Sequence, residues 1–250
     1  MAIKYNTPPI VTRGLYLYHD YANTKCYPGS GTTVNNISKI NTNTATMIGS
    51  TAYSTDNGGC MVFNGPNNNT RINFSANDNG QDTNYSFING INNNFSFSFW
   101  TNMDAVATST GTSGSPIHLN FYGAGRRFFT TMGDGGVVNK IHMRGQIGGT
   151  WQSPVSSDII EIGKWYNFAV TYHTSNGFKA YTNGSLSGTS TVTGEFSSTT
   201  TAVGVTVGAP DSWNRNIDGK MAAISIYKDV VLTDAEVLQN YNALKQRFGL

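Results

Sequence analysis

The sequence predicts an all-β domain of two stacked antiparallel sheets, closed by one short helix at the C-terminus. Three observations predict this fold class. Apolar and polar residues alternate with a period of two along much of the chain. Clusters of glycine and asparagine separate the alternating segments. No strand alternates with a long amphipathic helix before residue 233, which excludes a parallel α/β sheet.

The clearest predicted strand covers residues 95–99. Three phenylalanines occupy alternate positions there, with Ser96 and Ser98 between them, so we expect a half-buried strand with its serines on the outer face. The same pattern predicts roughly a dozen strands in all. The others are expected at 15–18, 60–63, 71–74, 116–122, 126–132, 138–144, 165–172, 203–207 and 221–227.

Two local signals predict the chain's turns and its end. Asn183-Gly184 separates the alternating segments 178–182 and 185–187, and this dipeptide tolerates the positive φ angles of a type I′ turn, so a tight hairpin is expected. Thr233 and Glu236 have the spacing of a capping box, and an apolar stripe follows them at helical intervals. A helix is therefore predicted over 233–247.

Composition and charge limit the partners. A net charge of +2, from 16 basic and 14 acidic residues without a basic run, predicts that the chain does not bind nucleic acid. No window approaches the ~20 apolar residues of a membrane span, and residues 1–9 lack the apolar core of a secretion signal, so we expect a soluble chain without membrane insertion. Cys26 and Cys60 are expected to be reduced and buried.

Several sequence blocks, in order, resemble laminin-G-like, concanavalin A-like domains. Five blocks carry the resemblance. They are an opening segment that contains Gly-Leu and Pro-Gly, a strand and turn that begin with Gly-Gly, a strand of alternating Phe and Ser, a hairpin that runs from a Trp to Asn-Gly, and a closing strand followed by Leu-Thr-Asp-Ala-Glu. These blocks cover residues 14–29, 58–65, 95–100, 163–184 and 218–236. The family resemblance implies a concanavalin A-like (laminin-G-like) jelly-roll sandwich over residues 14–250, preceded by an extended arm at 1–13.

The closing segment 240–250 resembles the domains found in tailed-phage virion proteins. The resemblance implies a structural protein located in the virion, either decorating the capsid or forming part of a fibre. Its expected partners are other virion proteins or copies of itself, with cell-surface glycans as a further partner. Two alternatives remain: a carbohydrate-binding module without an assembly role, and a polysaccharide lyase or hydrolase.

Many relatives carry acidic residues that supply oxygens to Ca²⁺ at two places. Here those places hold Asn64, residues 67–69 (all asparagine), Ala222 and Ala223. Tight Ca²⁺ sites usually need several carboxylates, so no metal and no cofactor are predicted. Asp134 and Asp211 are the carboxylates nearest in character to such a site.

Enzymatic activity is not expected. Glycosidases of this fold carry local Glu-x-Asp-x-x-Glu motifs, which this sequence lacks. Asp158 and Glu161 are interpreted as solvated charges whose spacing would place them on opposite faces of a strand. His142 and Arg144 share a strand face, as a lyase acid and base would, and are interpreted as polar surface.

Glycan recognition commonly combines an aromatic face with amides and arginine. Residues 211–216 supply this combination in Trp213, Asn214 and Arg215, with Trp151 and Tyr122 as further candidates. The alternative interpretation is that Trp213 is partly buried beneath its own loop.

An assembly contact is predicted in the N-terminal arm. Pro8 and Pro9 favour an extended path, and Tyr5 and Ile10 give the arm apolar surface to bury against another subunit or a capsid.

Overall fold

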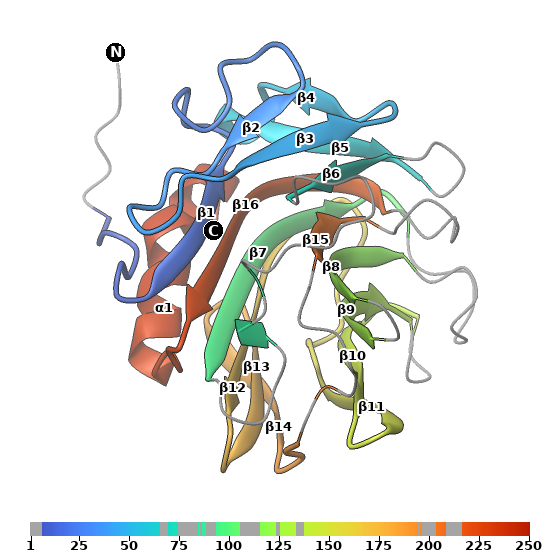
Figure 1. The fold of residues 1–250 in the computed structure, drawn as a ribbon. Helices are drawn as coiled ribbons and strands as arrows, with labels where there is room; N and C mark the ends of the chain where they lie inside the picture. Colours follow the sequence, from blue (N-terminus) through green and yellow to red (C-terminus); the bar gives the residue numbers. More distant parts are fainter. Residues whose placement is uncertain are drawn as a thin grey trace.

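The computed structural model describes residues 7–65, 70–74, 85, 87–88, 94–105, 116–123, 126–133, 138–194, 196, 204–208 and 217–250. These residues form two eight-stranded sheets that pack face to face (Figure 1). Every pairing between the described strands is antiparallel. The predicted jelly-roll sandwich is confirmed.

One sheet, here called sheet A, contains the longest strands. Its order is β14 (Ser185–Ser190), β13 (Gly177–Thr182), β12 (Trp165–His173), β7 (Phe95–Met103), β16 (Asp218–Lys228), β5 (Cys60–Asn64) and β4 (Ala52–Ser54). Strand β1 (Leu15–Asp20) pairs with the second half of β16, while β5 pairs with its first half. Strand β16, near the C-terminus, therefore pairs directly with β1, near the N-terminus.

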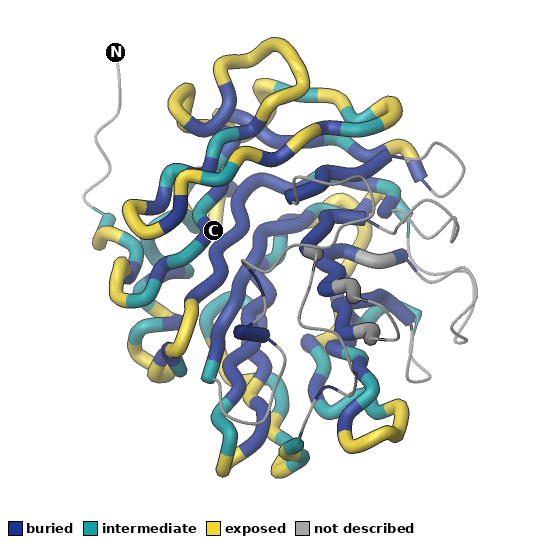
Figure 2. The backbone as a smooth tube through the Cα atoms, viewed as in Figure 1, coloured by how far each residue is buried: buried dark blue, intermediate teal, exposed yellow. Residues whose placement is uncertain are grey.

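The second sheet, sheet B, lies on the other side of the core. Its order is β11 (Thr150–Ser156), β10 (Ile141–Ile147), β9 (Arg126–Met132), β8 (Ile117–Gly123), β15 (Gly204–Val207), β6 (Arg71–Asn73), β3 (Thr44–Ile48) and β2 (Thr33–Asn35). Buried backbone runs through the centres of both sheets, and exposed residues gather at turns and rims (Figure 2).

Aromatic rings from both sheets form the core between them. Phe97 on β7 lies 5.6 Å from Phe121 on β8, and Phe121 stacks on Phe128 of β9 at 4.9 Å between ring centroids. All three are buried, as the alternation predicts. Rings at these distances add directional contacts to the burial of apolar area.

The outer face of sheet A differs from the prediction. Ser96 and Ser98 were expected to face solvent, but both are buried. The Ser96 hydroxyl donates to the carbonyl of Val230 and accepts from the N–H of Leu232, and the hydroxyls of Ser98 and Ser225 lie 2.8 Å apart. The C-terminal segment packs on this face, so β7 is covered on both sides.

The C-terminal helix α1 (Asp234–Leu244) begins at the predicted capping box. The N-cap Thr233 hydroxyl accepts from the backbone N–H of Glu236, and the Glu236 side chain accepts from the backbone N–H of Thr233. A short 3-10 turn, η3 (Lys245–Phe248), continues the helix. Phe248 stacks on Trp100 of β7 with 4.3 Å between centroids, which fixes the end of the chain against sheet A.

The predicted hairpin is also confirmed. Asn183 and Gly184 have φ angles of +51° and +77°, the positive values that a type I′ turn requires. The turn connects β13 to β14 directly.

The structure corrects the start of one predicted strand and adds four strands that the sequence did not predict. Residues 138–140 lie in a turn, and the strand expected at 138–144 begins at Ile141. Four strands were missed: β2, β3, β4 and β11. The structure also describes a 3-10 turn, η1 (Asp56–Gly58), before β5. Cys26 and Cys60 are buried free thiols, as predicted.

Candidate functional site

The predicted glycan residues fall in different places. Trp213, Asn214 and Arg215 lie outside the described residues. Tyr122 lies on β8, paired with Arg127 of β9, and only its backbone position is described. Trp151 lies on β11, immediately after the Gly148-Gly149 turn that joins β10 to β11. Of the five candidates, Trp151 is the one whose side chain lies within the described residues.

The indole of Trp151 projects from the outer face of sheet B and is 41% exposed. It is paired in register with Gln146 on β10. The guanidinium carbon of Arg144 lies 5.3 Å from the centroid of the indole, and the ring of Phe129 lies 6.1 Å away. Arg144 and Phe129 thus support the indole from the sheet and leave much of its surface open to solvent.

Arg144 is positioned by its own strand and by β11. Its Nη1 donates to the hydroxyl of Ser153 at 3.4 Å, and the neighbouring residues Met143 and Ile147 point into the core. A β-bulge between Met143 and Gly145 changes the register with β11 at this point. The result is a cation beside an exposed aromatic ring and the amide of Gln146.

A row of side chains crosses the outer face of sheet B from this site. Strand pairing places Asn73, Thr206, Asn120, Phe129 and Arg144 directly opposite one another, from β6 to β10. The Nδ2 of Asn120 donates to the Thr206 hydroxyl at 3.4 Å. The first four residues of the row are buried, and Arg144 is partly exposed. The row provides amide and hydroxyl groups at the centre of the sheet and a cation towards its edge.

Positive charge is concentrated in the same part of the chain. Residues 105–157, which include strands β8 to β11, contain four basic residues and one acidic residue. The rest of the chain contains 12 basic and 13 acidic residues. The small overall charge therefore conceals a cationic section that includes Arg144.

A cavity lies on the outer face of sheet A. It is a cleft of about 460 Å³ between β12, β13 and the start of α1, with Thr171, His173, Lys179 and Asp234 among its lining residues. Lys179 Nζ lies 2.9 Å from Asp234 Oδ1, and hydrogen bonds from Lys179 and Tyr181 hold the pKa of Asp234 below its usual value. In this cleft the charges of Lys179 and Asp234 neutralise each other, and none of the described lining residues is a tryptophan, tyrosine or phenylalanine. The cleft is therefore less suited to binding a glycan than the surface around Trp151.

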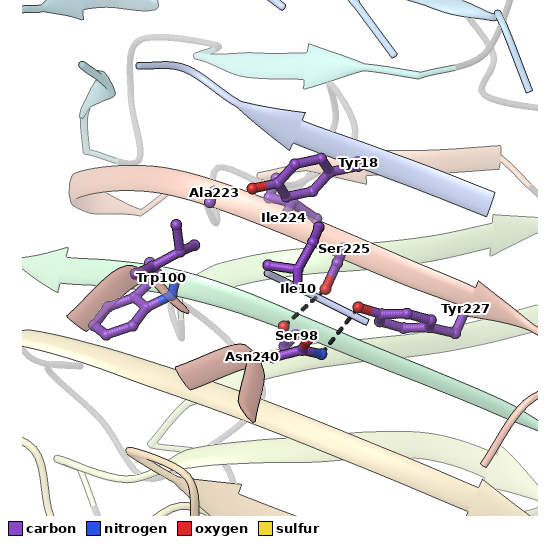
Figure 3. Close-up of a pocket in the computed structure, with 10 residues that line it drawn as sticks. Ile10, Tyr18, Ser98, Trp100, Ala223, Ile224, Ser225, Tyr227 and Asn240 are labelled. Atoms are coloured by element: carbon purple, nitrogen blue, oxygen red, sulfur yellow. Dashed lines mark hydrogen bonds between the residues drawn. The ribbon is translucent and has the colours of Figure 1, made fainter. Parts of the chain in front are cut away.

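The described part of the predicted assembly arm packs on its own domain. Ile10 lies in a pocket between β1, β7, β16 and α1, and Figure 3 shows it facing Ser225, Tyr227 and Asn240. Pro8 and Pro9 are exposed, whereas Tyr5 is outside the described residues. In the single chain the described part of the arm lies on its own helix, and the predicted contact with another subunit or a capsid stays a prediction.

The places compared with the Ca²⁺ sites of relatives lie only partly within the described residues. Ala222 and Ala223 are buried against Trp100 and Phe248 on the outer face of sheet A. Within the described ranges, no group of three histidine, cysteine, aspartate or glutamate side chains could hold a metal ion. Residues 67–69, Asp134 and Asp211 are outside those ranges.

The residues considered for catalysis also lie differently from the prediction. His142 was interpreted as surface but is buried on β10. Asp158 and Glu161 lie in the connection between β11 and β12, not on opposite faces of a strand. Glu161 is exposed and forms an ion pair with Lys164 at 2.8 Å, which agrees with its interpretation as a solvated charge.

The prediction that this chain is not an enzyme stays a prediction. Within the described ranges, no helix is both long and apolar enough to cross a bilayer.

Comparison with known proteins identifies the fold family. The family model described as the concanavalin A-like lectin/glucanases superfamily matches residues 75–238, which is more than half of the chain. No curated protein matches the chain in sequence.

Solved structures share the architecture at low identity. Domain 4 of AbnA, an extracellular arabinanase from Geobacillus stearothermophilus, in complex with arabinotriose, has a TM-score of 0.63 and 15% identity over 92% of this chain and 100% of that one. The binding domain of Botulinum neurotoxin DC, in complex with rat synaptotagmin II, has a TM-score of 0.66 and 14% identity over 94% of this chain and 52% of that one.

Trypanosoma rangeli sialidase in complex with sialic acid has a TM-score of 0.64 and 15% identity over 97% of this chain and 36% of that one. This chain therefore spans about half of the neurotoxin binding domain and about a third of the sialidase. At these identities the likeness shows the fold, which binding domains share with glycosidase chains.

Proposed function

Because the chain belongs to the concanavalin A-like lectin/glucanases superfamily, we propose that it is a glycan-binding domain whose site lies on the outer face of strands β9, β10 and β11. The observation that carries the proposal is the exposed indole of Trp151 beside the guanidinium of Arg144. An indole can cover the C–H face of a sugar ring, while the neighbouring guanidinium and the Gln146 amide can bind its oxygens.

We further propose that the preferred glycans are acidic. Arginine recognises a carboxylate through two parallel N–H bonds, and such charge-assisted bonds are stronger than those to neutral hydroxyls. The excess of basic residues in segment 105–157 would draw a negatively charged glycan to this side of the molecule. Trp213, Asn214, Arg215 and Tyr122 are proposed as further members of the site on their chemistry alone.

Binding to a panel of neutral and acidic oligosaccharides, measured by calorimetric titration, tests the proposal. We expect Trp151→Ala to weaken binding at least about tenfold, since stacking and burial of an indole contribute over 1 kcal/mol. Ile40→Ala, which removes another exposed apolar side chain far along the sequence, is the matched control and should bind normally. Arg144→Gln should reduce the preference for acidic over neutral glycans, and raising the salt concentration should do the same.

The outcomes separate the two parts of the proposal. Binding of neutral glycans that depends on Trp151 would retain the glycan site and reject the acidic preference. Glycan binding that is unchanged in folded Trp151→Ala would reject the site. Product release from the same oligosaccharides would instead assign the chain to the glycosidase branch of the fold.

We also propose that the domain is a structural component of a phage virion, as capsid decoration or part of a fibre. The support is the ordered set of sequence blocks and the closing segment 240–250, which resemble tailed-phage domains. An antibody against the chain should label purified particles, and the chain should be present in them at many copies. Its absence from particles would favour the alternative, a carbohydrate-binding module without an assembly role.

A further inference from the structure

The outer face of sheet A holds one residue of the N-terminal arm by both of its backbone groups. The N–H of Val11 donates to Oδ1 of Asn240 at 2.8 Å, and the Tyr227 hydroxyl donates to the Val11 carbonyl at 3.1 Å. Asn240 in turn donates from Nδ2 to the Tyr227 hydroxyl oxygen at 2.9 Å (Figure 3). Asn240, Tyr227 and Val11 are all buried, so this network is shielded from water.

Neighbouring contacts extend the recognition along the arm. Nε2 of Gln239 donates to the carbonyl of Pro9 at 2.7 Å, and Arg13 forms an ion pair with Glu236 at 3.0 Å. Ile10 packs against the apolar cluster that includes Val11 and Tyr227, and the cavity that it lines is only about 10 Å³, at the lower limit for one water molecule. The domain surface therefore recognises an extended peptide by its main chain and one apolar side chain, with no requirement that the peptide be its own.

The connection between the arm and the sandwich is short and built as a turn. The N–H of Leu15 donates to the Thr12 carbonyl at 3.2 Å, and Gly14 has a φ of +67°. A Cβ at Gly14 would collide with Val230, so this position requires glycine in the closed turn. Opening such a turn moves the arm as a unit, because Pro8 and Pro9 keep the released segment extended.

We propose that this surface also receives the arm of a second copy of the chain, so that two domains exchange arms reciprocally. Reciprocal exchange preserves each contact described above and produces a two-fold symmetric pair. The inference concerns self-association and goes beyond the glycan site, which lies on sheet B.

Exposed apolar side chains lie beside the arm-binding helix and support a second copy as the occupant. Leu238 on α1 is 44% exposed and Leu186 on β14 is 50% exposed. The Gly184 turn, two residues before Leu186, lies against Leu238. A second domain joined through exchanged arms would approach α1 and cover these side chains.

Cross-linking between two variants tests the exchange directly. A tagged chain with Pro9→Cys is mixed with an untagged chain with Gln239→Cys at a concentration on the order of 100 µM, and the mixture is treated with a short bis-maleimide. Cys26 and Cys60 are buried, and the unaltered chain controls for their reaction. We expect a covalent product that contains one tagged and one untagged chain.

The control variants keep the test decisive. A chain with both substitutions shows that the linker spans the contact. An untagged chain with Thr150→Cys, an exposed position on β11 of sheet B, replaces the Gln239→Cys chain as the control and should give little mixed product. Cross-linking of the double variant within single chains only, with no mixed product, would overturn the proposal. A mixed product formed equally well with Thr150→Cys would also overturn it, because the link would then come from random collision or another contact.

Discussion

Two buried histidines make the stability of this domain sensitive to mild acid. His19 stacks on Phe74 with 4.8 Å between centroids, and neither of its ring nitrogens has a hydrogen-bond partner within the described ranges. His118 stacks on Phe99 at 5.4 Å, and its Nε2 lies 3.2 Å from the sulfur of Met103. Burial disfavours the charged imidazole and lowers the pKa of each histidine to about 3.

The sign of the effect follows from proton binding. In the unfolded chain a histidine has a pKa of about 6.5, so below that pH the unfolded state binds protons that the folded state does not. Stability is therefore lost as pH falls from about 6.5 towards 3. Between pH 7 and pH 5 the loss is about 2 kcal/mol for each histidine and about 4 kcal/mol for both, a large part of a typical domain stability of ~5–15 kcal/mol.

Urea unfolding at pH 7 and pH 5 measures this loss. The substitution His19→Leu removes one titrating ring and retains apolar volume next to Phe74. We expect it to reduce the loss between the two pH values by about 2 kcal/mol, and His118→Leu to do the same independently. His173→Asn, at the end of β12 on the surface side of the sheet, is the control for a histidine outside the core.

A specific result would refute this reasoning. If His19→Leu loses as much stability as the unaltered chain between pH 7 and pH 5, while remaining folded at pH 7, the ring does not carry the expected proton linkage. A hidden water or polar partner at His19 would produce that result.

Three further substitutions test how local features hold the fold, each read from the free energy of unfolding in urea. Thr233→Ala removes the N-cap hydroxyl and should cost about 1 kcal/mol, whereas Thr233→Ser should cost little. Gly184→Ala adds a Cβ at positive φ, 3.1 Å from Leu238, and should cost about 1–2 kcal/mol; an unchanged midpoint would contradict the turn geometry. Arg247→Met leaves Asp20 without its 2.6 Å ion pair and should cost about 2–3 kcal/mol, part of which Asp20→Asn in the same chain should restore.

The features that the sequence predicted correctly are those with a local physical cause. The alternation at β7 reflects a core face that repeats at every second residue, and the Asn183-Gly184 turn reflects two residues that tolerate positive φ. The capping box at Thr233 likewise needs only residues within one turn of helix.

The missed strands lack that local signal. Strands β2 and β4 have three residues each, which is too short for a period to be recognised. Strand β11 lies at the edge of sheet B, contains Pro154, and is mostly exposed or half-buried, so apolar alternation is absent. Its identity depends on pairing with β10, which the Gly148-Gly149 turn alone did not reveal.

The sequence pattern also did not show that parts of the outer face of each sheet are buried. Ser96 and His142 were expected at the surface, because alternation separates two faces without showing what covers the outer one. For Ser96 the cover is the Val230–Leu232 segment, more than a hundred residues away in sequence. The contact between Arg247 and Asp20 spans the whole chain and has no local sequence signal.

The two sheets differ in what their outer faces can still bind. On sheet A, the helix α1 and the arm already cover β7 and β16 with a buried network at Asn240, and Trp100 is closed off by Phe248. On sheet B, the indole of Trp151 is exposed on the outer face and lies beside the guanidinium of Arg144. Among the described residues, the exposed indole suited to the proposed glycan lies on sheet B, and arms exchanged over α1 would join two copies without covering it. Self-association on one sheet and glycan binding on the other are compatible in a single domain, and pairing would present two glycan sites on one assembly, which raises avidity without any new contact.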